Sequence, residues 1–257
     1  MYHEVADVPE RDRSVRRIDP AYSLPVRQFE GQMEYIQNNG YEVVSIDALC
    51  DDSFTRNGSV CITFDDGLIG NYIHAFPVLQ RYNFSAAFFV VVSKVSGSRH
   101  MNWEHLIELH RHGHSIQSHT LSHPMLGEID DGRIYQELDK SKKIIEDRIG
   151  SEVRCLSLPF GSSSERVVDI AREVGYSAIF TSRINELRVA EYPYRFGRIP
   201  VKDVYDLDLF GELVKGRSIF YYKLVFLDYV KSSLKRTIGL NTYRRIYRAV
   251  KRIKPEK

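Results

Sequence analysis

The stretch Ser59-Val60-Cys61-Ile62-Thr63-Phe64-Asp65-Asp66-Gly67 decides the fold, because a short apolar run ends there at two adjacent carboxylates and a glycine. Four to eight apolar residues before a glycine turn signal are typical of a buried strand. Asp65 and Asp66 then lie at its carboxyl end, where open α/β sheets and α/β barrels hold their chemistry. Two neighbouring carboxylates repel each other and are costly to bury, so we expect a cation beside them, most simply a divalent metal. A strand-to-helix turn capped by an Asp is the plainer alternative.

A second polar stretch lies at 113–124 (GHSIQSHTLSHP), where His119 and His123 are four residues apart. If one helical turn follows a strand at 114–118, both imidazoles lie on one face. Neutral imidazole suits zinc and its first-row neighbours, and one added carboxylate completes a His/His/Asp set with positions left open for water and substrate. The chain has nine His, so the spacing alone is modest evidence. It gains weight because the Asp pair ends another predicted strand.

These two stretches resemble the first two motifs of the NodB-homology polysaccharide deacetylases: 63–67 (TFDDG) matches the first and 118–124 (SHTLSHP) the second. The similarity extends more loosely from Tyr2-His3 to about Val201. It implies an α/β fold, a distorted (β/α) barrel of about seven parallel strands. We expect a basic helical extension at the C-terminal end.

The resemblance also implies roles for individual residues. Asp65 would be the catalytic base, and Asp66, His119 and His123 would hold one divalent metal, zinc first, with cobalt, nickel or manganese as alternatives. His3 follows Tyr2 as in many relatives and would point into the site, or else face solvent.

The segment 155–161 (CLSLPFG) aligns with the family's third motif, commonly Arg-x-Pro-Tyr, but departs from it. Pro159 and Phe160 keep the turn and the substrate-facing aromatic. Ser157 stands where an Arg would hold the base, and a hydroxyl cannot reproduce a bidentate guanidinium. If another residue substitutes, Arg195 or Arg198 from a different strand end should lie within hydrogen-bonding reach of Asp65.

The family's late Leu-x-His motif, which supplies the general acid, has no match near 198–200 (RIP). His3 or an Arg would have to substitute, or the acid is absent. The missing Arg and the missing acid together motivate a second hypothesis: a catalytically degraded deacetylase that binds a glycan or a partner protein.

The rest of the chain alternates predicted helices and strands. Helices are expected at 26–39, 71–82 with a kink or a break at Pro77, 102–112, 133–149 and 165–174, and strands at 1–5, 41–46, 85–92, 114–118, 176–181 and 195–201. Four further histidines, His100, His105, His110 and His112, are interpreted as surface or helix-capping residues.

Composition bounds the class of protein. With 257 residues, 43% hydrophobic and 27% charged, the chain suits one large α/β domain with an appendage. Cys50, Cys61 and Cys155 have no metal or redox spacing and are interpreted as buried free thiols in a reducing compartment. The first residues lack the apolar core of a signal peptide, and no apolar run is long enough to span a membrane. We therefore expect a cytoplasmic protein.

Charge divides the chain into two expected domains, 1–211 and 212–257. Residues 215–257 contain thirteen Lys or Arg against two acidic residues, a net charge of +11, which leaves −9 on the first 214 residues. Apolar and basic residues alternate at helical spacing in 219–230 and 243–253. This pattern is typical of peripheral binding at the inner face of a membrane; the alternative is an extension packed on its own barrel. No nucleic-acid-binding module accompanies the charge, so we expect no nucleic acid partner.

From the resemblance we expect a metal-dependent hydrolase that removes acetyl groups, N-acetyl first and O-acetyl as the alternative, from a sugar of a polysaccharide or its lipid-linked precursor. Besides the degraded deacetylase, a different metal hydrolase on the same scaffold, such as a phosphoesterase, remains an alternative.

Overall fold

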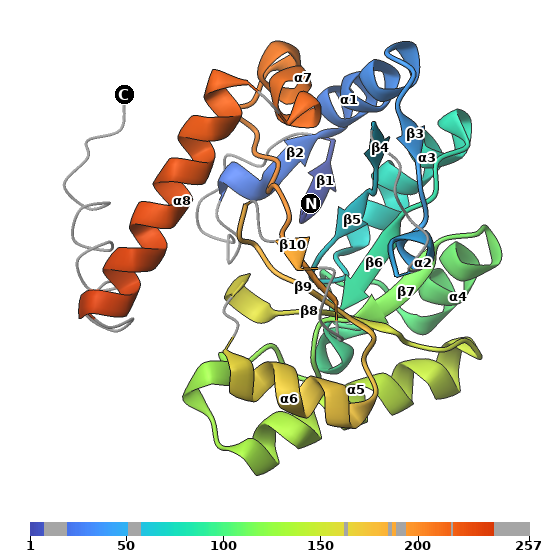
Figure 1. Ribbon diagram of the computed structural model, residues 1–257. Coiled ribbons are helices and arrows are strands. Elements are labelled where there is room, and N and C mark those ends of the chain that lie inside the picture. Colours follow the sequence, from blue (N-terminus) through green and yellow to red (C-terminus); the bar gives the residue numbers. More distant parts are fainter. Residues whose placement is uncertain are drawn as a thin grey trace.

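A computed structural model describes residues 1–7, 20–50, 58–161, 164–184, 187–188, 194–216 and 218–238. Helices surround a curled sheet (Figure 1). The helices are α1 (Val26–Asn38), α2 (Ile46–Leu49), α3 (Phe76–Tyr82), α4 (Trp103–Arg111), α5 (Asp131–Ile149), α6 (Glu165–Val174), α7 (Leu207–Lys215) and α8 (Ile219–Ile238). The strands are β1 (Glu4–Ala6), β2 (Ser23–Pro25), β3 (Glu42–Val43), β4 (Ser59–Val60), β5 (Thr63–Phe64), β6 (Ala87–Val90), β7 (Ser115–Ser118), β8 (Cys155–Ser157), β9 (Ala178–Phe180), β10 (Leu187–Arg188) and β11 (Tyr194–Phe196).

The main sheet has the order β10-β11-β9-β8-β7-β6-β5. Six of its strands are parallel, whereas β10 runs antiparallel to β11. The expectation of about seven parallel strands is therefore corrected to six. The reason is the short connection: β10 ends at Arg188 and β11 begins at Tyr194, and so few residues permit a hairpin but not a parallel crossover.

The deciding stretch forms two short strands rather than one. β4 pairs with β3, and β5 pairs with β6. Between β4 and β5 the chain passes from the two-stranded β3-β4 sheet into the main sheet, so Asp65 and Asp66 directly follow a strand of the main sheet.

The first residues of the chain lie between the two ends of this open sheet. On one side the backbone N–H of Tyr2 donates to Thr63 O at 2.8 Å, and that of Asp65 donates to Tyr2 O at 3.0 Å. On the other side the backbone N–H of Val201, beyond β11, donates to Met1 O at 2.9 Å. These bonds join β5 to the segment after β11 and close the barrel.

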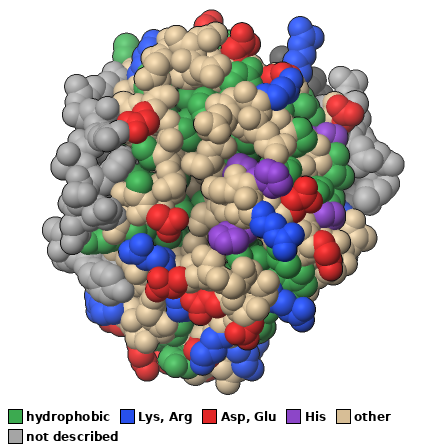
Figure 2. Space-filling model, turned by 90° about the vertical axis from the view of Figure 1, so that its right-hand side faces the viewer, with side chains coloured by type: hydrophobic (Ala, Val, Ile, Leu, Met, Phe, Trp, Pro, Cys, Tyr) green, Lys and Arg blue, Asp and Glu red, His purple; other side chains and the backbone are tan. Residues whose placement is uncertain are grey.

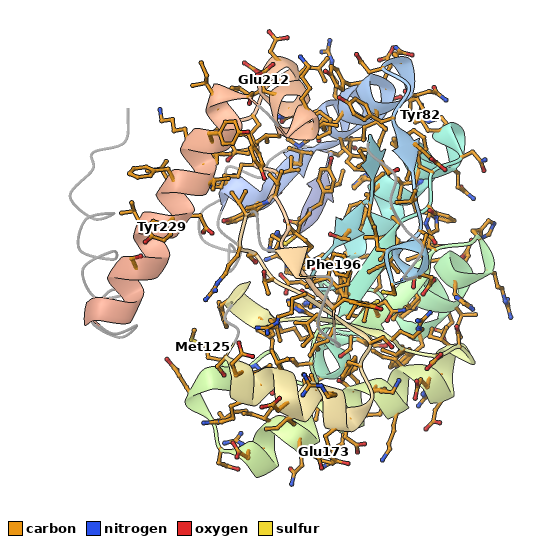
Figure 3. All side chains as sticks on the ribbon, viewed as in Figure 1. Tyr82, Met125, Glu173, Phe196, Glu212 and Tyr229 are labelled. Atoms are coloured by element: carbon orange, nitrogen blue, oxygen red, sulfur yellow. The ribbon has the colours of Figure 1, made fainter. Side chains whose placement is uncertain are left out.

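Side chains of the sheet alternate between two apolar clusters. On β6, Phe88 joins the large cluster shared with the helices, while Ala87 and Phe89 join a smaller one on the opposite, inner face. Phe64 stacks on Phe88 with ring centroids 4.8 Å apart. Phe196, labelled in Figure 3, belongs to the inner cluster. The alternation follows from the two-residue period of a strand covered on both faces.

Local signals are largely confirmed. The helix expected at 71–82 changes from a π-helical segment at Asn71–Ala75 to α3 just before Pro77, which lies in the first turn of α3. His105 completes a capping box with Asn102 at the start of α4, and His112 contacts Glu108 O at the end of that helix, as expected of capping histidines. Figure 2 shows the face to which α3 and α4 belong, where charges of both signs mix with several histidines.

At the C-terminal end, α7 packs on α1 and contacts α8. Residue 211, the expected domain boundary, lies within α7. The helix expected at 243–253 falls outside the described residues.

Candidate metal centre and catalytic base

The two carboxylates after β5 diverge because Asp66 and Gly67 both adopt left-handed backbone conformations, with φ of 71° and 70°. A Cβ on Gly67 would lie 3.2 Å from Val90 Cγ1, so glycine suits this close approach to β6. Asp65 is buried and Asp66 is half-buried. The neighbours are therefore directed into different surroundings.

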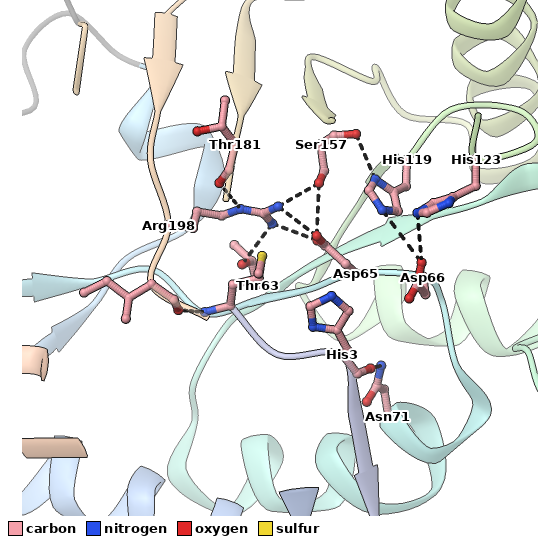
Figure 4. A network of polar contacts seen from close by, with 12 residues as sticks. His3, Thr63, Asp65, Asp66, Asn71, His119, His123, Ser157, Thr181 and Arg198 are labelled. Atoms are coloured by element: carbon pink, nitrogen blue, oxygen red, sulfur yellow. Dashed lines mark hydrogen bonds and ion pairs between the residues drawn. The ribbon is translucent and has the colours of Figure 1, made fainter. Parts of the chain in front are cut away.

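The predicted ligands do come together. The Oδ1 of Asp66 lies 3.7 Å from Nε2 of His119 and 3.5 Å from Nε2 of His123 (Figure 4). One ligand atom from each of the three residues lies within 4.8 Å of the others, and this is the one such group among the described residues. One carboxylate oxygen and two imidazole nitrogens are a donor set that suits zinc and related ions.

The backbone that presents the histidines differs from the sequence-based expectation. No helical turn follows β7; instead Thr120 and His123 have φ of 69° and 64°. The Thr120 hydroxyl accepts a hydrogen bond from the His123 backbone N–H at 2.9 Å. The expected helical face is thus wrong, although the residues it selected do converge. Left-handed conformations of non-glycine residues are uncommon and gather at functional sites.

The orientation of His119 is set by β8. Its Nδ1 lies 2.8 Å from the backbone carbonyl of Ser157, which can only accept, so Nδ1 donates this hydrogen bond and Nε2 is the nitrogen that faces Asp66. Burial, followed by the charge of His119, lowers the pKa of His123 to about 4. Both rings therefore present Nε2 to Asp66, and a cation bound there would take them as neutral imidazoles.

Asp65 is held by Arg198. The Nη1 and Nη2 atoms of Arg198 donate to the two carboxylate oxygens at 2.7 Å and 2.8 Å. Burial acts to raise the pKa of Asp65, but the charges of Arg198 and His119 and the hydrogen bonds from Arg198 outweigh it and lower the pKa well below its usual range. The sequence-based prediction that Arg195 or Arg198 replaces the missing motif Arg is confirmed for Arg198.

Arg198 is itself fully engaged. It donates from Nη2 to the Ser157 hydroxyl at 2.7 Å and from Nε to Thr181 O at 3.2 Å. Its guanidinium carbon lies 5.2 Å from the Phe89 ring centroid and 5.9 Å from that of Phe180. The Ser157 hydroxyl also contacts Asp65 at 3.1 Å. Ser157, which stands where the family's third motif commonly has an Arg, thus bridges Asp65 and Arg198 by hydrogen bonds.

Three other predicted site residues surround this centre. Phe160, at φ 60° and 59% exposed, places its ring 4.9 Å from that of His123, whereas Pro159 is buried beside it. His3 lies below Asp65 and Asp66 in Figure 4. Its Nδ1 is buried and has no hydrogen-bond partner among the described residues. Burial lowers the pKa of His3, while the charges of Asp65 and Asp66 oppose this effect.

Sequence reasoning did not foresee the aromatic surroundings of Arg198 or its bond to Thr181. The apolar runs that carry Phe89 and Phe180 were recognised as strands. Which of their side chains face the site, however, depends on the register between distant strands.

The fold and the cluster define an α/β protein with a curled, mainly parallel sheet and a candidate metal centre at the carboxyl ends of its parallel strands. Residues 53–179 match the family model described as polysaccharide deacetylase. The Bacillus subtilis protein YxkH is 28% identical over 220 residues, covering 84% of this chain and 75% of YxkH. The Staphylococcus aureus poly-beta-1,6-N-acetyl-D-glucosamine N-deacetylase is 22% identical over 221 residues, covering 79% and 74%.

Among solved structures, the Streptococcus pyogenes deacetylase PplD superposes with a TM-score of 0.74 at 19% identity, covering 82% of this chain and 94% of that one. At this identity the likeness concerns the fold. Taken with the family model and the curated relatives, the chain belongs to the polysaccharide deacetylase family.

The pairing of Arg198 with Asp65 can be tested through stability. Arg198→Ala leaves a buried carboxylate without its partner, so we expect the free energy of unfolding in urea to fall by about 3–5 kcal/mol. Adding Asp65→Asn removes that charge and should recover at least about 1 kcal/mol of the loss. Arg195→Ala is the matched control, because Arg195 is also buried but pairs with Glu165 at 2.8 Å; Asp65→Asn should give no recovery there. Additive effects of Arg198→Ala and Asp65→Asn would contradict the pairing.

Proposed function

We propose that this protein is a metal-dependent deacetylase that removes N-acetyl groups from a sugar of a polysaccharide or its lipid-linked precursor. One observation carries the proposal: an ionised, buried carboxylate, Asp65, lies directly beside the Asp66/His119/His123 cluster. The relatives' activities on acetylated polysaccharides support the substrate class. The degraded-deacetylase alternative loses much of its motivation, because Arg198 supplies the cation that Ser157 cannot.

Amide hydrolysis needs an activated water, a polarised carbonyl and a proton for the leaving amine. The cluster fits one divalent ion, zinc first, and such an ion would supply Lewis-acid polarisation of the acetyl oxygen and acidify a water molecule. Asp65 would accept the proton of the attacking water. Arg198 keeps Asp65 ionised and fixes the direction of both its oxygens. The exposed ring of Phe160 would pack against the sugar.

We propose His3 as the proton donor to the leaving amine, in place of the absent late histidine motif. Two observations support this role. His3 lies below the two carboxylates in Figure 4, and its buried Nδ1 has no hydrogen-bond partner among the described residues, so it is available to a ligand. Burial lowers the pKa of His3, whereas the charges of Asp65 and Asp66 raise it and so favour the protonated ring that a proton donor needs.

The outer side of α8 supports peripheral contact with a membrane. Five apolar side chains form a stripe along it, Ile219, Tyr222, Phe226, Tyr229 and Val230, all exposed; Figure 3 labels Tyr229 on this helix. The opposite side packs on the barrel, where the Phe220 and Tyr205 ring centroids are 5.7 Å apart. Within the described part of the chain, every helix is too short or too polar to cross a bilayer.

Charge favours an anionic surface as the partner of this stripe. The segment 215–257 carries a net charge of +11, and each basic residue near an anionic leaflet contributes about 1 kcal/mol before screening. A hydrogen bond from the Ile184 backbone N–H to Asp228 at 3.3 Å ties α8 to the loop after β9, at the same end of the sheet as Asp65. We therefore propose that the protein works in the cytoplasm at the inner face of the membrane, on a lipid-linked sugar.

The activity and the roles of the two carboxylates are tested together by acetate release from N-acetylglucosamine oligomers and lipid-linked sugars, with and without added zinc or cobalt. Asp65→Asn should keep a stoichiometric metal in elemental analysis but lose at least about a hundredfold in rate. Asp66→Asn, the matched variant one residue away, should lose the metal, as should His119→Ala. Equal metal loss in both Asn variants would refute the assigned roles.

The role of His3 predicts a different signature. His3→Ala should keep the metal and lower the rate by about a hundredfold, because the leaving amine lacks its proton donor. A substrate whose leaving group needs no proton, such as an acetyl ester of an acidic phenol, should lose much less. Loss of the metal, or an equal loss of rate on both substrates, would show that His3 acts otherwise.

The stripe predicts salt-sensitive binding of the full-length chain to anionic vesicles. Phe226→Ser/Tyr229→Ser should weaken sedimentation with these vesicles by at least about tenfold, because it removes two aromatic groups from the lipid contact. Ile73→Ser/Tyr135→Ser is the control, since both side chains are exposed on other helical segments. If full-length protein ignores such vesicles at low salt, or if both double variants bind alike, the stripe has another partner.

A further inference from the structure

Two of the three cysteines meet on the inner face of the sheet. This face carries the smaller apolar cluster, which consists of Ile46, Cys50, Ala87, Phe89, Cys155, Ala178, Phe180 and Phe196. Cys50 caps the C-terminal end of the one-turn helix α2, and Cys155 begins β8, 105 residues later. Their Sγ atoms are 3.6 Å apart, and both residues are buried. Chain spacing gave no hint of this contact.

The thiol pair lies beneath the candidate catalytic base. Cys155 and Ser157 are two residues apart on β8, so their side chains point to the same face of the sheet. Ser157 contacts Asp65 and Arg198, and Phe89 and Phe180 of the same cluster lie against Arg198. Cys50 and Cys155 therefore belong to the same layer of inner-face side chains that contacts Asp65 and Arg198.

Either sulfur can donate the hydrogen bond between the two thiols. When Cys155 is the donor, this bond lowers the pKa of Cys50, although burial acts against this. The same hydrogen bond and burial raise the pKa of Cys155 well above its usual value. Burial raises the pKa of the nearby Cys61 to about 12. Cys50 is thus the thiol suited to react first as a thiolate, and Cys155 is placed to attack it.

We propose that Cys50 and Cys155 form an oxidisable pair that closes to an intramolecular disulfide in the presence of a peroxide. The contact has to shorten from 3.6 Å to about 2 Å. The Cys50 thiolate attacks one oxygen of hydrogen peroxide; the O–O bond breaks, leaving a sulfenic acid at Cys50 and hydroxide, which takes up the displaced proton as water. The Cys155 sulfur then attacks the Cys50 sulfur, and its proton leaves with the departing hydroxyl as a second water. Two thiols are oxidised and one peroxide is reduced.

This inference is independent of the proposed deacetylase activity. The disulfide would close a loop from residue 50 to residue 155, within which Asp65, Asp66, His119 and His123 all lie. A cross-link over so long a loop restricts the unfolded chain strongly, so the oxidised protein should melt at least about 5 °C above the reduced protein. In a reducing compartment the pair would remain as thiols until an oxidant appears.

The experiment treats the folded full-length chain with dilute hydrogen peroxide, alkylates the remaining thiols after unfolding, and maps the digest by mass spectrometry. We expect a Cys50–Cys155 linked peptide pair that thiol reductants separate, with Cys61 alkylated. Thermal melts of the same samples should show the rise in Tm, reversed by reduction.

Matched variants make the result decisive. Cys61→Ser should keep the cross-link and the rise in Tm, whereas Cys50→Ser should lose both; a cooperative thermal melt of the reduced protein shows that each variant is folded. A link that contains Cys61, or sulfinic acid at Cys50 without a link, overturns the proposal. The proposal is also overturned if Cys50 and Cys155 of the folded protein both remain as alkylatable thiols at a peroxide dose that fully oxidises the chain unfolded in guanidinium.

Discussion

The structure depends on one buried ion pair, between Asp65 after β5 and Arg198 after β11. In the main sheet these two strands are separated by β6, β7, β8 and β9, so the pair spans the open side of the curled sheet. Both side chains are almost completely buried, at 4% and 6% exposure. A buried carboxylate without its partner would be severely destabilising. The buried position of Asp65 in the first motif is therefore stable only when β11, the last parallel strand, brings Arg198 beside it, and the same holds for Arg198.

The elements that sequence reasoning predicted well are those with local causes. The change of helix type just before Pro77, the capping histidine of α4 and the strand end just before Asp65 follow from backbone chemistry and short-range patterns. The metal-ligand set was selected by spacing and family resemblance, and its three side chains do converge. The assumed helical turn does not form, because left-handed residues reverse the chain there instead.

What sequence reasoning left open depends on long-range register. Arg195 and Arg198 are three residues apart, yet one pairs with Glu165 and the other with Asp65. Only the position at which β11 pairs with β9 decides between them. The contact between Cys50 and Cys155 and the direction of β10 also depend on how distant segments pair.

The region matched by the family model, 53–179, contains Asp65 and the three candidate ligands, whereas His3 and Arg198 lie outside it. The candidate metal ligands thus all lie within the matched region. The residues that hold or adjoin the base, Arg198 and His3, come from the two ends of the barrel.

The closure of the barrel by Met1, Tyr2 and Val201 has a consequence for the order of folding. Asp65 and Arg198 are 133 residues apart, and contacts of such separation carry a large loop-closure entropy and form slowly. The β6-α4-β7 unit, by contrast, can form from neighbouring segments. We expect a nascent chain to assemble the histidine-bearing part first, with Asp65 still hydrated. Dehydration of that carboxylate, arrival of Arg198 and completion of the barrel would then be a single cooperative event, so a chain caught before it would resemble a deacetylase in its helices and strands while lacking an organised catalytic base.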